Sequence, residues 1–101
     1  MFIYNVTNKV DHNIAEAWIE WMRNEHIPEI IATGCFSHAN ILYLLEADDE
    51  EGKTYAIQYH TNSRQLYQDY LDQFSQEMRQ KAIQKWGDKF IAFRSIMELV
   101  E

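Results

Sequence analysis

Residues 55–59 read YAIQY and residues 90–100 read FIAFRSIMELV, two runs rich in aromatic and aliphatic side chains that are typical of β-strands. The segment Ser63–Trp86 between them is too long for a loop, and its apolar residues recur at helical spacing. The same order of strand, helix and strand occurs in residues 1–45. Two copies of this unit predict an α+β chain of order βαββαβ. The predicted fold is a ferredoxin-like sandwich, with a four-stranded antiparallel sheet and two helices on one face.

The first copy contains a strand from Met1 to Val10, an amphipathic helix around Trp18 and a second strand from Phe36 to Leu45. Asn13, followed three residues later by Glu16, resembles a capping box at the start of the helix. Pro28 disfavours helical geometry at the residue before it, so we expect the regular helix to end or bend near His26.

The second copy has its helix cap at Asn62 or Ser63. Its apolar residues repeat at every fourth position and predict one continuous buried stripe, formed by Leu66, Tyr70, Phe74 and Met78. Gly87 is the expected stop.

Composition limits the possible functions. The 101 residues are 47% apolar and predict a single domain, residues 1–101. A net charge of −7 disfavours nucleic acid and anionic membranes as partners. No apolar stretch reaches the roughly 20 residues of a membrane span, and no signal peptide is evident, so we expect a cytoplasmic protein. Cys35 is the one cysteine and cannot form an internal disulfide, which fits a reducing compartment.

The last strand predicts that both faces of the sheet are apolar. Phe90, Ala92 and Ile96 alternate with a second apolar set, which consists of Ile91, Phe93, Met97 and Leu99. Exposed side chains of this size favour a homodimer packed sheet against sheet. A ligand-lined or merely imperfect surface is the alternative.

Two residues are unusual for their positions. His26, near the predicted helix end beside Trp21 and Glu25, is either a general base near neutral pH or a favourable charge at a helix C-terminus. Arg94 lies within an apolar strand, where a guanidinium needs a partner. It either pairs with Glu98, reaches an acid across a dimer, or holds the carboxylate of a ligand.

The four histidines form no metal-binding motif, since none makes an i, i+4 pair and the cysteine has no CxxC partner. We therefore expect no metal and no tightly held cofactor. His38 with Asn40, and Gln58 with His60, lie on strand faces that converge if the two strands pair. Whether His26 joins His38 and His60 is left open. The acidic run at residues 48–52 lacks the EF-hand spacing and is interpreted as a solvated hairpin loop.

Four segments resemble an uncharacterised bacterial family, domain of unknown function family 4286: IYNVT, WIEWMRNEHIPEIIATGCF, YAIQY and GDKFIAFRSIMELV. The resemblance covers nearly the whole chain. It implies a subunit of the dimeric α+β barrel kind and no established activity. That wider group includes cofactor-independent monooxygenases and haem-degrading enzymes, which place their active groups between sheet and helices. By position, the residues that match such a pocket are Trp21, His26, Tyr59 and Arg94.

Two hypotheses follow. In the first, a homodimer binds a small molecule between sheet and helices and turns it over in the manner of a cofactor-independent monooxygenase. In the second, the chain is a non-enzymatic interaction or regulatory module, whose apolar sheet face serves only for dimerisation or for docking a protein.

Overall fold

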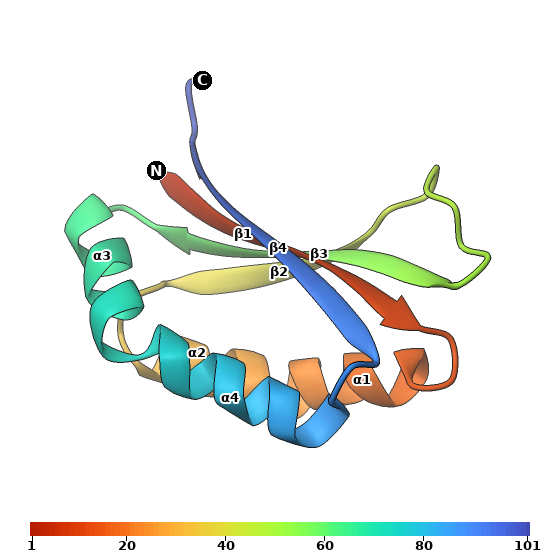
Figure 1. The fold of residues 1–101 in the computed structure, drawn as a ribbon. Coiled ribbons are helices and arrows are strands. Elements are labelled where there is room, and N and C mark those ends of the chain that lie inside the picture. Colours follow the sequence, from red (N-terminus) through yellow and green to blue (C-terminus); the bar gives the residue numbers. More distant parts are fainter.

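The computed structural model describes residues 1–101. The elements follow in the order β1 (Phe2–Asp11), α1 (Ala15–Trp21), the π-helix η1 (Met22–His26), α2 (Ile27–Ala32), β2 (His38–Tyr43), β3 (Gly52–Thr61), α3 (Arg64–Gln73), α4 (Ser75–Trp86) and β4 (Phe90–Glu98). The strands form one antiparallel sheet in the order β2-β3-β1-β4. All helices lie on one side of it (Figure 1). The predicted ferredoxin-like architecture is confirmed.

The strand register assigns each side chain to a face. Tyr4 of β1 is paired with Tyr59 of β3 and with Ile96 of β4. Tyr4 and Tyr59 are buried beneath the helices. Because successive side chains point to opposite faces, the neighbouring pair of Ile3 and His60 lies on the outer face.

The first helical segment continues through His26 instead of ending there. Its buried residues Trp18, Met22, His26 and Ile30 are each four positions apart. In an α-helix each such step advances the stripe by about 40° around the axis. The wider turn of η1 reduces this drift and keeps the side chains on the sheet. Pro28 is tolerated because it lies in the first turn of α2.

The second helical segment, residues 64–86, keeps its apolar side chains on the sheet by a break between two helices. The prediction of one helix from Ser63 to Trp86 is wrong, because Phe74 has φ −126° and separates α3 from α4. Ser63 is the cap, and its side chain accepts a hydrogen bond from the Leu66 N–H at 3.1 Å. Leu66 itself is exposed, because α3 turns it away from the sheet.

Two smaller predictions in the first half are also wrong. The capping box is absent: Ile14 occupies the N-cap position, and the Asp11 carboxylate instead accepts a hydrogen bond from the Asn13 N–H at 2.8 Å. The strand expected from Phe36 to Leu45 is shorter at both ends. Phe36 is buried among aromatic rings, and Leu45 is exposed in the loop after β2.

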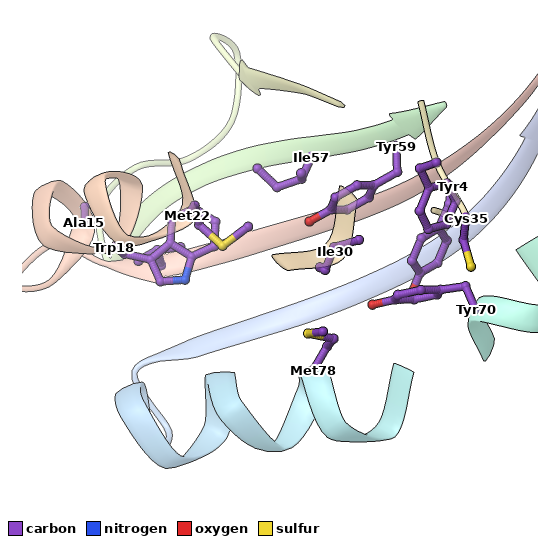
Figure 2. Packing of buried hydrophobic residues seen from close by; sticks show 12 residues of the cluster. Tyr4, Ala15, Trp18, Met22, Ile30, Cys35, Ile57, Tyr59, Tyr70 and Met78 are labelled. Carbon is purple, nitrogen blue, oxygen red and sulfur yellow. The ribbon is translucent and has the colours of Figure 1, made fainter. Parts of the chain in front are cut away.

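The core lies between the sheet and the helices (Figure 2). At one end Trp18 stacks on Tyr55, with ring centroids 5.7 Å apart. At the other end four aromatic rings are packed together, those of Tyr4, Phe36, Tyr59 and Tyr70. A cavity lies in this layer.

The outer face of the sheet carries no helix (Figure 1). The predicted apolar residues of the last strand, Ile91, Phe93, Met97 and Leu99, are all exposed there. Phe93 has 67% of its surface accessible. The prediction that both faces of the sheet are apolar is therefore confirmed for β4.

Candidate functional site

A cavity of about 50 Å³ lies between the inner face of the sheet and the helices. All four residues chosen from the sequence line it: Trp21, His26, Tyr59 and Arg94. They come from α1 and η1 of the first helical segment and from strands β3 and β4. Most of the remaining wall is apolar and includes Trp18, Met22, Ile57 and Met78. The cavity is therefore a mainly apolar chamber with a few polar groups.

His26 is held at the helix side of this chamber. The side chain is 8% exposed, and its ring stacks on Trp21 with centroids 4.4 Å apart and planes 18° apart. Trp21 also makes an edge contact with Trp86, at 5.9 Å. The π-helix places His26 at this point, and π-turns are frequent at functional sites.

Burial controls the charge of His26. Loss of solvation lowers its pKa to about 4, and Lys81 lowers it further while Glu29 opposes the shift. The imidazole is therefore neutral at neutral pH. The interpretation as a favourable charge at a helix C-terminus does not fit a neutral ring in a helical segment that continues through α2. A role as general base stays a prediction.

Two buried nitrogen atoms near this ring pair have no hydrogen-bond partner, Nδ1 of His26 and Nε1 of Trp86. A buried polar atom without a partner costs about 1–3 kcal/mol, so such atoms are rare in folded proteins. Both side chains contact Trp21. Of these two residues only His26 lines the chamber, so its Nδ1 is the unused polar atom that a bound molecule could reach.

The other side of the chamber presents phenols. Figure 2 shows the hydroxyl group of Tyr70 pointing toward Met78 and that of Tyr59 lying near Ile30, and both residues line the chamber. Burial raises the pKa of both groups, and neighbouring tyrosines add to the shift. Both phenols stay protonated and can donate hydrogen bonds to a ligand.

Two arginines lie where the chamber meets a second, more open groove of about 230 Å³. Arg79 of α4 and Arg94 of β4 line both spaces, together with Ala82 and Phe90. The predicted pair of Arg94 with Glu98 does not form, because Arg94 is exposed and the ion pairs of the chain all involve Lys81. Arg79 was not selected from the sequence, since nothing in a helix pattern marks one exposed arginine among several.

The outer face of the sheet holds a separate polar group. The rings of His38 and His60 stack 4.2 Å apart, and Nε2 of His60 lies 2.8 Å from Oδ1 of Asn40. Gln58 donates to Asn5 at 3.3 Å. The predicted convergence of His38, Asn40, Gln58 and His60 is therefore observed. His26 is not part of it, because it faces the opposite side of the sheet.

In the acidic loop between β2 and β3, Asp49 makes two contacts with residues outside the loop. Asp49 accepts a hydrogen bond from the Tyr43 hydroxyl, and its backbone oxygen contacts the His12 ring. The structure contains no group of three or more His, Cys, Asp or Glu side chains that could hold a metal ion. None of its helices has both the length and the apolar character needed to cross a bilayer.

Solved structures of the same architecture are found at low sequence identity. A protein of Nitrosomonas europaea provisionally named an antibiotic biosynthesis monooxygenase has a TM-score of 0.67 and 16% identity, with 100% of both chains covered. SnoaB, a cofactor-independent oxygenase from Streptomyces nogalater, has a TM-score of 0.66 and 13% identity, over 99% of this chain and 94% of the other. An ethyl tert-butyl ether degradation (EthD) family protein from Bacillus halodurans has a TM-score of 0.66 and 13% identity, over 99% of this chain and 100% of the other. These likenesses show the fold.

The sequence itself gives a family match. The family model described as "Domain of unknown function (DUF4286)" matches residues 1–100. No curated protein matches the sequence.

Proposed function

The chain belongs to the DUF4286 family, and we propose that it binds a small, mainly apolar molecule in the chamber between the sheet and the helices. The observation that carries the proposal is the meeting of Trp21, His26, Tyr59 and Arg94 on the wall of one cavity. Apolar walls with a few converging polar groups are typical of ligand sites. Trp21 and Tyr59 supply aromatic surface, and Arg94 supplies a positive charge at the rim.

His26 acts in this proposal as a neutral hydrogen-bonding group. Its Nδ1 is buried without a partner, so a ligand atom that bonds to it removes an existing cost. With a pKa lowered to about 4, the free imidazole is a weak base at neutral pH. Orientation of the ligand is therefore its first role.

The ligand must occupy more space than the closed chamber offers. A volume of about 50 Å³ holds only a few water molecules, whereas binding pockets usually measure about 300–1,000 Å³. The chamber and the outer groove of about 230 Å³ share the side chains of Ala82 and Phe90. We infer that Phe90 moves to join the two spaces when a ligand binds.

Turnover without a bound cofactor is the second part of the proposal. The fold is shared with a protein named as a cofactor-independent oxygenase, and most of the chamber wall is apolar. Oxygen uptake, measured on the same samples as binding, separates turnover from binding alone. Binding without uptake leaves a binding protein, and the absence of both favours the interaction or regulatory module.

Replacing His26 with Gln or Phe is expected to weaken ligand binding by up to about tenfold, because one hydrogen bond contributes roughly 0.5–1.5 kcal/mol. The Phe variant also keeps an aromatic ring on Trp21 and removes the unpartnered Nδ1. Its melting temperature should therefore equal or exceed that of the wild type. Affinity is measured by calorimetry with the ligand that native mass spectrometry finds on the purified protein or, failing one, with 5-hydroxy-1-naphthoic acid, which carries a hydroxyl group for Nδ1 in addition to its carboxylate.

Glu25→Gln is the matched control, since Glu25 lies in the same π-helix but is exposed and does not line the chamber. It should leave affinity unchanged. If His26→Phe bound the ligand as tightly as the wild type, His26 would have no part in the site. A large loss of stability in both His26 variants would make the residue structural.

We also propose that two copies pack through their outer sheet faces. The support is the exposed apolar row along β4 and the residue after it, made by Ile91, Phe93, Met97 and Leu99. Phe93→Glu would place a charge in this interface and remove a large aromatic contact, which typically costs at least 2 kcal/mol at such a position. Light scattering after size exclusion should then report a monomer at concentrations where the wild type is a dimer.

Ile83→Glu serves as the control for this experiment. Ile83 is also large and exposed, but it lies on α4, on the helix side of the molecule. The control should remain dimeric. A monomeric wild type, or dissociation of both variants alike, would refute packing through the sheet.

A further inference from the structure

The two arginines at the mouth of the chamber form a local positive site on an acidic protein. Neither Arg79 nor Arg94 is among the residues of the ion pairs, and the chain as a whole carries a net charge of −7. Both guanidinium groups act on the hydroxyl of Tyr70, so they lie at the same end of the chamber. Two positive charges at close range repel each other, and an anion bound between them would replace this repulsion with attraction to both.

The surrounding groups indicate the kind of anion. A guanidinium presents a planar fork of N–H donors that matches a carboxylate with two parallel hydrogen bonds. The protonated phenols of Tyr59 and Tyr70 offer further donors beside it. A carboxylate at this position would accept bonds from every polar group that faces it.

The rest of the ligand is defined by the apolar walls. Beyond the arginines the chamber is walled mainly by apolar side chains, among them Ile57, Met78 and Trp21. A sugar carries more hydroxyl groups than the few polar atoms of this wall could bond, and each one left without a partner would cost about 1–3 kcal/mol. An apolar body, aromatic above all, fits against the rings that line the space.

The way in is between α4 and β4. The outer groove is lined only by residues of these two elements and of the turn that joins them, including Ile83, Gly87 and Ala92. It shares both arginines with the chamber. A ligand that passes this way with its apolar end first leaves its carboxylate at the arginines.

We propose that the chamber's ligand is a carboxylic acid with an apolar, mainly aromatic body, whose carboxylate is held between Arg79 and Arg94 at the mouth between α4 and β4. This inference rests on the proposed function, because it concerns the ligand of the same chamber. It assigns to Arg79 a role in choosing the ligand class.

The test compares acids with neutral molecules of the same shape. Calorimetry is done with 1-naphthoic acid and 1-naphthalenemethanol, and again with benzoic acid and benzyl alcohol. In the wild type each acid should bind at least about tenfold more tightly than its alcohol, as expected for two charge-assisted contacts. Arg79→Gln and Arg94→Gln should each weaken acid binding about fivefold, a modest loss because both side chains are exposed. The double variant should bind acid and alcohol equally.

Arg23→Gln is the matched control, because Arg23 is an exposed arginine of the π-helix that lines neither space. Arg23→Gln should change neither the affinity for the acids nor the affinity for the alcohols. Unchanged binding of the alcohols by all variants shows that the chamber is intact. High salt should weaken binding of the acids and leave that of the alcohols unaffected.

The outcomes separate this inference from the proposed function. If acids and alcohols bind the wild type equally, the carboxylate site is refuted while the binding chamber stands. If none of the four probes binds, both proposals fail. Tighter binding of 1-naphthyl phosphate than of 1-naphthoic acid, by tenfold or more, would replace the carboxylic acid with a phosphate ester.

Discussion

Replacing Trp18 with alanine is expected to lower the free energy of unfolding by about 4 kcal/mol, within the range measured for large aromatic side chains in cores. Trp18 is 1% exposed and stacks on Tyr55, so its removal leaves a cavity between α1 and the sheet. The loss combines the transfer of the indole to water with contacts that the neighbours cannot recover. A domain of this size has a total stability of roughly 5–15 kcal/mol, so the variant should be largely unfolded at modest urea concentrations.

Urea unfolding at one fixed protein concentration measures this effect, because dimer formation makes stability depend on concentration. Leu45→Ala is the control, since Leu45 is 81% exposed in the loop after β2 and should change stability by less than about 0.5 kcal/mol. A loss below 1 kcal/mol for Trp18→Ala would mean that the indole is not packed as the structure has it.

Acid is expected to destabilise the protein by about 3 kcal/mol through His26 alone. Burial lowers the pKa of His26 in the folded chain to about 4, against 6.5 for an exposed histidine. Between these values the unfolded chain binds a proton that the folded chain refuses, so stability falls as the pH falls from 6.5 to 4. Above pH 6.5 the contribution is constant, and below 4 the loss is complete.

His26→Phe isolates this contribution, because the variant lacks the titrating ring and keeps the aromatic contact. As the pH falls from 6.5 to 4, the free energy of unfolding of the wild type should decrease by about 3 kcal/mol relative to that of the variant. Outside this window the difference between the two proteins should stay constant. The charged groups nearest His26 are Glu29 of α2 and Lys81 of α4, which contact each other and remain in both proteins. An identical pH profile in the two proteins would show that His26 titrates normally in the fold.

His60 contributes in the same direction on the outer face. Burial lowers its pKa, and the stacked ring of His38 lowers it further. Because both proteins in the comparison carry these two histidines, their effect cancels in the difference. If two copies pack through their outer sheet faces, titration of His60 should make dimerisation depend on pH.

The architecture was predictable because it depends on local patterns. Alternating runs at both ends of the chain, and longer apolar periods between them, define strands and helices one element at a time. With this doubled order of elements, few topologies give one antiparallel sheet with all helices packed on one face. The choice of Trp21, His26, Tyr59 and Arg94 rested on the resemblance to a group whose members place their active groups between sheet and helices, and one cavity brings the four together.

Other features were not predictable from a single sequence. The four-residue spacing of Trp18, Met22 and His26 is equally consistent with an α-helix that drifts, a π-turn or a break. The chain uses the π-turn in its first helical segment and the break at Phe74 in its second. Which of them forms depends on the surface against which the stripe packs.

The sequence by itself thus determined the order of elements and the faces of the strands, because these follow from side-chain polarity and period. Four residues of the chamber wall followed from the resemblance to the dimeric α+β barrel group. Only the tertiary structure decided the charge of His26, the unpaired state of Arg94 and the partnership of Arg79 with it. Solvation and charge interactions depend on neighbours that are distant in the chain. Arg79 and Arg94 belong to different elements, and no local pattern shows that they share one mouth.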